Sequence, residues 1–165
     1  MERKVLLFVC TGNICRSPMA QAYVVHRARE DGLALEADSA AVSSEEVGRL
    51  PDGRAVAELS RHGVAMPMHR ARQVRPADFG RFDLVIGMTR SHCASLRALA
   101  PRAHADKVRL LLDAVPGHAG RDVPDPWYGP EDAFADAYAL IAAGIDALIA
   151  ALRLPKGPFA SVVAR

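Results

Sequence analysis

The chain has 165 residues, 50% of them hydrophobic and 24% charged, a length that suits one globular domain with a substantial core. Lys plus Arg number 21 and Asp plus Glu number 19, which leaves a formal net charge of +2. Because neither sign dominates, the composition gives no support for a nucleic-acid-binding or membrane-surface protein.

The apolar runs and the cysteines predict the location of the protein. The run from Val5 to Val9 is shorter than the hydrophobic region of a secretory signal peptide, and no run approaches the roughly 20 apolar residues of a membrane span. Three cysteines, an odd number in a chain that needs no covalent staples, favour a reducing compartment. The sequence therefore predicts a cytoplasmic protein with one domain over residues 1–165, in which residues 154–165 form a loosely held tail.

Short apolar runs alternate along the chain with longer stretches of helical pattern. Buried strands are predicted at residues 4–9, 35–39, 83–88 and 108–112. Helices are predicted at residues 17–30, 52–62, 89–100 and 130–152, with Ser17 and Thr89 as N-caps and a long ordered loop at 113–129. This alternation indicates an α/β protein, an open parallel sheet with helices on both faces. Ligands of such sheets bind beyond the carboxyl ends of the strands, so the candidate site lies in the loops that follow them.

The loop after the first strand, Cys-Thr-Gly-Asn-Ile-Cys-Arg-Ser at residues 10–17, has the composition of an oxyanion site. A strand-to-helix turn directs backbone N–H groups and the positive end of the helix dipole toward one point. Gly12 and Asn13 tolerate the backbone angles of such a turn, and Arg16 supplies a planar fork for two phosphate oxygens. The same positive field favours the thiolate of Cys10, which is the nucleophilic form. The usual nucleotide-binding P-loop is excluded, because the chain lacks the Gly-x-x-x-x-Gly-Lys pattern.

A second candidate segment, Val-Pro-Asp-Pro-Trp-Tyr-Gly, occupies residues 123–129. Attack of a thiolate on phosphorus is faster when an acid protonates the leaving oxygen, and Asp125 between two prolines is presented from a stiff loop. Trp127 and Tyr128 are predicted to form walls for a flat aromatic substrate. Asp122 is a rival acid without the flanking prolines or the aromatic pair, and Asp-Pro is also common as plain turn punctuation.

The segments at residues 9–18 and 125–129 resemble the low-molecular-weight protein tyrosine phosphatases, and the similarity extends through residues 39–43, 51–55, 71–73 and 78–83 to about Leu152. The resemblance implies a four-stranded parallel sheet with the phosphate-binding loop after the first strand. It makes Cys10 the nucleophile of a phosphocysteine intermediate, Arg16 the phosphate clamp, and Asp125 the general acid and then the general base. The implied phosphate-binding residues are Thr11, Gly12, Asn13, Ile14, Cys15, Arg16 and Ser17.

The resemblance also assigns supporting roles. Ser17 is expected to donate a hydrogen bond to the Cys10 sulfur, and Asn13 to hold the loop in shape through hydrogen bonds to Ser39 and His69. Cys15 matches a position that forms a reversible disulfide with the nucleophile under oxidation, but it is equally interpreted as a small buried side chain.

Three positions depart from the family pattern. Thr89 and His92 stand where many members have Asp and Asn, which puts a local contact in question. Glu45 stands where many members have Trp at the rim of the crevice, so the acidic pair Glu45-Glu46 is expected to favour basic sequences around a phosphotyrosine.

Three alternative functions remain open. A protein-arginine phosphatase shares the loop but has Thr at the position of Ile14; Ile14 and the Trp127–Tyr128 pair favour tyrosine. An arsenate reductase needs two further cysteines, whereas only Cys93 lies outside the loop. A phosphate-binding module without turnover would not need the full set of Cys10, Arg16 and an acid.

The spacing of His and Cys residues matches no metal site, so no metal or cofactor is expected. The implied partner is a phosphotyrosine protein, with a bacterial tyrosine kinase as one candidate. Neither nucleic acid nor a membrane is expected as a partner, and the protein is predicted to be a monomer or a weak dimer.

Overall fold

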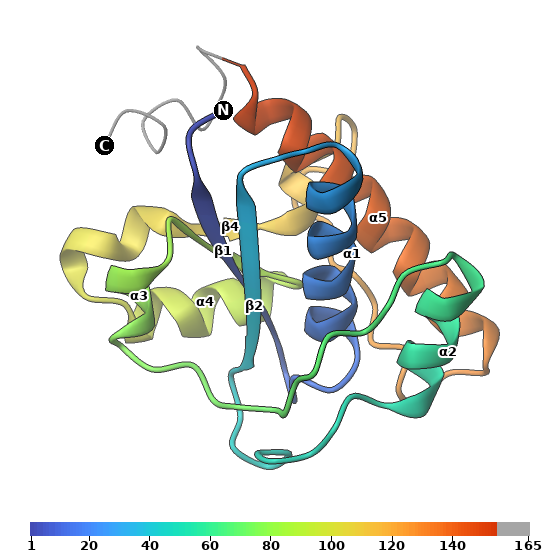
Figure 1. The fold of residues 1–165 in the computed structure, drawn as a ribbon. Coiled ribbons are helices and arrows are strands. Elements are labelled where there is room, and N and C mark those ends of the chain that lie inside the picture. Colours follow the sequence, from blue (N-terminus) through green and yellow to red (C-terminus); the bar gives the residue numbers. More distant parts are fainter. Residues whose placement is uncertain (155–165) are drawn as a thin grey trace.

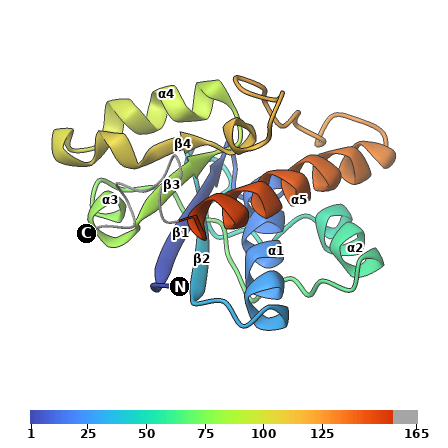
Figure 2. The same cartoon turned by 90° about the horizontal axis from the view of Figure 1, so that it is seen from above.

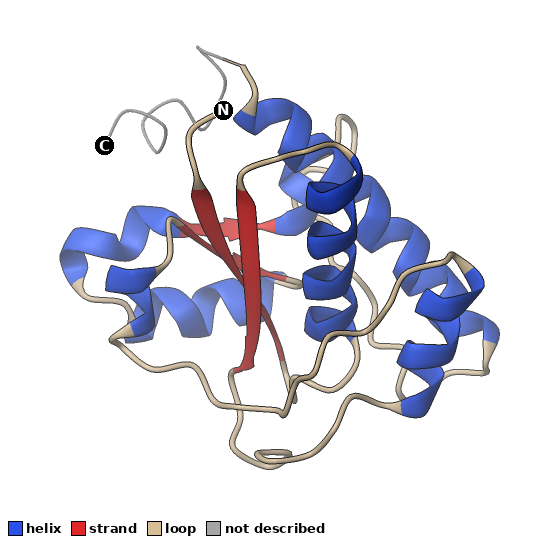
Figure 3. Ribbon diagram, in the orientation of Figure 1, coloured by secondary structure: helices blue, strands red, loops and turns tan. Residues whose placement is uncertain are grey.

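The computed structural model describes residues 1–154. Strand β1 (Lys4–Cys10) lies at the centre of the fold (Figure 1). It pairs in parallel with β2 (Leu35–Ala41) on one side and with β3 (Leu84–Gly87) on the other. The short strand β4 (Val108–Leu110) completes a four-stranded sheet of order β2-β1-β3-β4. Every pair is parallel, which confirms the predicted sheet (Figure 3).

The helices cover both faces of this sheet (Figure 2). Helices α1 (Arg16–Glu30) and α5 (Asp132–Leu152) pack on one face, with α2 (Gly53–Arg61) against their ends. The other face carries α3 (Asp78–Arg81) and α4 (Arg90–Leu99). Two 3₁₀ helices, η1 (Arg102–Lys107) and η2 (Leu111–Ala114), flank β4.

The alternation of side chains along β1 explains why the sheet has two apolar layers. Leu6 and Phe8 belong to the cluster beneath α1 and α5, whereas Leu7 and Val9 belong to the cluster beneath α3 and α4. All four side chains are fully buried, and burial of each stabilises the fold by about 1.5–3 kcal/mol. The strand therefore needs the continuous apolar run that the sequence has there.

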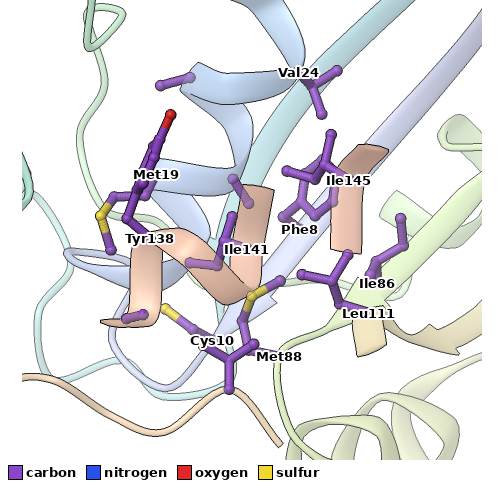
Figure 4. Packing of buried hydrophobic residues seen from close by; sticks show 14 of the residues in the cluster. Phe8, Cys10, Met19, Val24, Ile86, Met88, Leu111, Tyr138, Ile141 and Ile145 are labelled. Carbon is purple, nitrogen blue, oxygen red and sulfur yellow. The ribbon is translucent and has the colours of Figure 1, made fainter. Parts of the chain in front are cut away.

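The larger apolar cluster continues beneath the end of β1, where the site lies. Figure 4 shows Met88, Leu111, Ile141 and Ile145 gathered between the sheet and α5, with Cys10 at the near edge of the same cluster. Cys10 therefore packs against this apolar cluster, and the residue is only 3% exposed.

The sequence predicts a cap at two helix starts, those of α1 and α4, and only the cap of α4 agrees with the structure. Asp52 accepts a hydrogen bond from the Arg54 N–H and Thr89 accepts one from the His92 N–H, so these residues cap α2 and α4. The prediction that Ser17 caps α1 is wrong. Helix α1 already begins at Arg16 without a side-chain cap, because the Ser17 hydroxyl is bonded elsewhere in the site.

The predicted elements also differ from the structure in extent. Strand β2 is two residues longer than predicted, because Ala40 and Ala41 continue the parallel pairing with Val9 and Cys10 of β1. Strand β4 ends at Leu110, since the chain turns there into η2. Helices α3, η1 and η2 were not predicted, and the expected tail beyond Leu154 lies outside the described residues.

Helix α5 resembles a membrane-spanning helix in length and composition, although aspartate residues interrupt its apolar sequence. It has 21 residues, and among the described residues it is the one helix that is long and apolar enough to cross a membrane, judged by length and composition alone. One face of α5 is nevertheless committed to the apolar cluster on the sheet, through Phe134, Ile141 and Ile145. The core helix of a globular protein passes the same test.

Candidate active site

The candidate site lies beyond the carboxyl ends of β1 and β3. The chain leaves β1 to form β2 on one side of it and later returns to form β3 on the other side, so the connections diverge at this point of the sheet. A cavity of about 100 Å³ opens there. Its lining comes from three segments, at residues 10–16, 43–46 and 125–128.

The loop between β1 and α1 has the backbone of an anion site. Asn13 has φ +61°, the one positive value at a non-glycine residue in the described part of the chain. Over residues 1–154, no hydrogen bond is formed by the backbone N–H groups of positions 11–15, so these donors remain for a ligand at the positive end of α1. Gly12 was expected to supply unusual backbone angles, but its φ is not positive. It is needed for space, because a Cβ there would lie 3.0 Å from Cγ of Glu46.

A directed chain of hydrogen bonds joins the buried Asn13 side chain to the Cys10 sulfur. The Asn13 Oδ1 accepts from the Arg72 N–H at 3.1 Å and from His69 Nε2 at 2.7 Å. Two donors to this oxygen fix the orientation of the amide, so Nδ2 donates to the Ser17 Oγ at 2.8 Å. Ser17 Oγ lies 3.0 Å from Cys10 Sγ and has its own proton to donate to a thiolate there.

His69 contacts the Asn13 amide, and Ser39 in turn contacts His69. Burial lowers the pKa of His69, which keeps its imidazole neutral with Nε2–H as the donor to Asn13. Ser39 donates to Gln21 Oε1 at 2.6 Å and lies 3.3 Å from His69 Nε2. Ser39 therefore reaches Asn13 through His69 and does not contact the amide itself, in contrast to the expectation.

Arg16 is a buried cation that faces the cavity, with 4% of its surface exposed. One terminal nitrogen donates to the Val123 carbonyl at 2.9 Å. The other lies 3.5 Å from Asp125 Oδ2 and 3.5 Å from Thr11 Oγ1. Since only one carboxylate is near, the guanidinium keeps much of its capacity to bind an anion in the cavity.

Asp125 is held at the cavity by its own loop. Its Oδ1 accepts from the Trp127 N–H at 3.0 Å, and Arg54 donates to the Trp127 carbonyl at 3.3 Å. The Arg54 guanidinium also lies over the Trp127 ring at 5.2 Å and is held from the side by Asp52. Sequence reasoning missed Arg54, although its spacing of two residues from the helix cap Asp52 is a usable signal.

Asp122 lies apart from the cavity. Its carboxylate accepts a 2.8 Å hydrogen bond from the Arg90 N–H at the start of α4, and this bond lowers the pKa of Asp122. The side chain is thereby used to satisfy the helix terminus. The geometry favours Asp125 over Asp122 as the acid.

The other predicted wall residues also line the cavity. Trp127 is partly buried, whereas Tyr128 is 89% exposed and Glu45 stands at the rim. Glu46 packs over Gly12 and pairs with Arg49 at 2.8 Å, so Glu45 is the freer of the two carboxylates.

Cys15 lies in the same cavity lining as Cys10, and both are free thiols. Burial, with smaller contributions from the carboxylate of Asp52 and from Cys10, raises the pKa of Cys15 well above its usual range. Cys15 is thus a thiol at neutral pH, whereas the Cys10 sulfur contacts the Ser17 hydroxyl. Across residues 1–154, no cluster of His, Cys, Asp and Glu has the geometry of a metal site.

Comparison with known proteins agrees with this geometry. The family model described as low molecular weight phosphotyrosine protein phosphatase matches residues 5–156. The chain belongs to this family. A low molecular weight protein-tyrosine-phosphatase from Streptomyces coelicolor is 44% identical over 151 residues, which are 88% of this chain and 92% of that protein.

Two solved structures show how far the fold is shared. YfkJ from Bacillus subtilis is 36% identical, with a TM-score of 0.85 over 93% of this chain and 96% of that one. A Drosophila arginine phosphatase is 28% identical, with the same TM-score over 93% and 99% of the two chains. One architecture therefore carries both tyrosine and arginine phosphatases by name, and the substrate must be argued from the cavity.

Proposed function

We propose that the protein hydrolyses phosphotyrosine in protein substrates through a phosphocysteine intermediate on Cys10. The observation that carries this proposal is the bond chain from Asn13 through Ser17 to the Cys10 sulfur, next to a buried Arg16 and unpaired loop N–H groups. These groups provide a nucleophile, a site for the phosphoryl oxygens and stabilisation of the leaving sulfur at one point.

In the first step, the Cys10 thiolate attacks phosphorus, the S–P bond forms, and the bond from phosphorus to the tyrosine oxygen breaks. Asp125 gives its proton to that oxygen, and tyrosine leaves as the neutral phenol. Arg16 and the loop N–H groups bind the three phosphoryl oxygens.

In the second step, water attacks the phosphocysteine and the S–P bond breaks. The Asp125 carboxylate accepts the proton of the attacking water, and inorganic phosphate leaves. The thiolate that departs is stabilised by the Ser17 hydroxyl, which lies 3.0 Å from the sulfur. The nucleophile must remain reduced throughout, which fits the cytoplasmic location that the sequence predicts.

The test is phosphate release from a phosphotyrosine peptide in metal-free buffer. We expect turnover by the wild type, loss of it in Cys10→Ser, and a decrease of about 10²–10⁴-fold in kcat for Asp125→Asn. Asp122→Asn is the matched control on the same loop and is expected to stay within a few-fold of the wild type. Equal losses in the two aspartate variants would contradict the assignment of the acid, and no turnover by the reduced wild type would refute the function.

A second candidate substrate is phosphoarginine, because a Drosophila arginine phosphatase shares the fold closely. The cavity favours tyrosine: Ile14 gives it an apolar wall, and Trp127 and Tyr128 flank the entrance for a ring. Comparison of kcat/KM for phosphotyrosine and phosphoarginine decides between them. A higher value for phosphoarginine would overturn the choice of substrate and leave the cysteine mechanism intact. The identity of the natural phosphoprotein substrate, for which a bacterial tyrosine kinase is one candidate, stays a prediction. The oligomeric state, a monomer or a weak dimer, also stays a prediction.

A further inference from the structure

His92 is a buried residue of helix α4 that the mechanism above does not use. It is the third residue of α4, and its backbone N–H donates to the cap Thr89. A side chain at this position of a helix often turns back to the cap, as in a capping box. The His92 side chain instead points out of the helix toward the phosphate-binding loop, where Nε2 lies 2.9 Å from Thr11 Oγ1.

The close packing of α4 on β3 allows this reach. Gly87 is the last residue of β3, and a Cβ on it would lie 3.2 Å from Cβ of His92 and 2.7 Å from Sγ of Cys93. The first turn of α4 can lie this close to the strand because position 87 has no side chain. His92 is only 4% exposed as a result, and its place is fixed by the sheet.

Thr11 connects His92 to the phosphate clamp. Its Oγ1 also accepts from a terminal nitrogen of Arg16 at 3.5 Å, and Thr11 itself lines the cavity. The contacts run from α4 through the loop to the first residue of α1. They meet at a hydroxyl that stands at the wall of the phosphate site.

The direction of these hydrogen bonds decides what the hydroxyl does. Burial and the nearby Arg16 lower the pKa of His92 to about 4, so the imidazole is neutral near pH 7 and has one N–H. Nδ1 has no hydrogen-bond partner among the described residues. A proton on Nδ1 would be a buried donor without an acceptor. Buried donors without a partner are rarer in folded proteins than buried acceptors without one, so we place the proton on Nε2.

With Nε2–H as donor, Thr11 Oγ1 accepts two hydrogen bonds, one from His92 and one from Arg16. A hydroxyl oxygen has two lone pairs and one proton, so only the proton remains. We propose that the Thr11 hydroxyl donates this proton in a hydrogen bond to the phosphoryl group, and that His92 is the positioning residue that holds the hydroxyl in that orientation. The proposal deepens the proposed function, because it adds a side-chain donor to a site otherwise built from backbone groups and Arg16.

The experiment measures binding of inorganic phosphate by calorimetry, which does not need turnover. Thr11→Val removes the hydroxyl at nearly constant shape and is expected to raise the Kd for phosphate about tenfold, the scale of a charge-assisted hydrogen bond. Thr11→Ser keeps the hydroxyl and is expected to stay within about twofold of the wild type. An unchanged Kd in Thr11→Val would overturn the role of the hydroxyl.

A double-mutant cycle tests the role of His92. His92→Leu is expected to raise the phosphate Kd several-fold in the wild type and by less than about twofold in the Thr11→Val background. His92→Gln, which carries an amide N–H at a similar reach, is expected to restore most of the binding. Equal factors in the two backgrounds would show that His92 acts through the stability of α4 and would refute the positioning role.

Thr89→Ala is the control for a purely structural effect. It weakens the start of α4 but touches neither Thr11 nor the cavity, so its thermal midpoint falls while its phosphate Kd stays at the wild-type value. A phosphate Kd that follows the thermal midpoint across Thr89→Ala and His92→Leu would overturn the proposal. If phosphate binds as described but phosphotyrosine is not hydrolysed, the proposed function fails and the hydroxyl donor stands.

Discussion

Replacement of Asn13 by alanine tests the architecture of the loop most directly. The Asn13 side chain is fully buried, accepts two hydrogen bonds and donates one, and its backbone has φ +61°. In Asn13→Ala, the Arg72 N–H and His69 Nε2–H lose their acceptor, at about 1–3 kcal/mol each. Alanine in the left-handed region adds about 1–2 kcal/mol. We therefore expect the free energy of unfolding to fall by at least about 3 kcal/mol.

Urea unfolding followed by circular dichroism measures this change, and two further variants separate its parts. Asn13→Gly keeps the freedom for positive φ and should be more stable than Asn13→Ala by about 1 kcal/mol. Asn13→Asp keeps an acceptor for Arg72 and His69 but cannot donate to Ser17. Its carboxylate would accept the Ser17 proton in place of Cys10. We therefore expect a clear decrease in kcat with only a small decrease in the free energy of unfolding.

The result that would refute this reasoning is an Asn13→Ala protein within about 1 kcal/mol of the wild type. It would mean that the two donors find water or other acceptors at little cost. Full turnover by Asn13→Asp would separately contradict the role of the Ser17 proton at the sulfur.

Three further predictions follow from individual contacts. Gly144→Ala on α5 should lower the thermal midpoint despite the better helix propensity of alanine, because the new Cβ would lie 2.7 Å from Cγ of Leu111; an unchanged or raised midpoint contradicts it. The pKa of His92 is about 4 in the folded protein, below its ordinary value of 6.5, so as the pH falls the unfolded chain binds the proton first. The free energy of unfolding therefore decreases as the pH falls from 6.5 to 4, and the complete loss is about 3 kcal/mol. In urea unfolding at several pH values, His92→Gln should show a shallower loss between pH 6.5 and 4, and equal slopes would exclude the contribution. Glu45→Ala should reduce the preference in kcat/KM for basic over acidic phosphotyrosine peptides, with the effect largest at low salt, and an unchanged preference means that Glu45 does not select substrates.

Local sequence was enough to predict the parts of the fold whose forces are local. The apolar run of β1, the cap residue Thr89 and the alternation of elements all predicted what the structure shows. Ser17 is the instructive failure. By residue type it is a good N-cap, but its hydroxyl accepts a hydrogen bond from Asn13 and lies 3.0 Å from the Cys10 sulfur, an arrangement that exists only in the folded loop.

The sequence predicted which residues form the candidate site better than it predicted the hydrogen bonds that hold them in place. Cys10, Arg16 and Asp125 were selected by chemistry and lie together at one cavity. Two contacts that hold the site were not predicted: Asn13 Oδ1 accepts a hydrogen bond from the Arg72 N–H, and Arg54 donates to the Trp127 carbonyl in the loop of Asp125. Such contacts depend on which loops are neighbours, and single-sequence patterns carry no information about that.

The order of the strands explains which distant residues meet. Alternating strands and helices predict a parallel sheet but not whether β3 lies beside β1 or beside β2. The order β2-β1-β3-β4 puts the carboxyl end of β3 next to that of β1, so the start of α4 faces the loop after β1. Thr11 and His92, 81 residues apart, come into hydrogen-bond contact for this reason. His92, in the first turn of α4, thereby contacts the loop after β1, and its substitution is expected to change phosphate binding as well as stability.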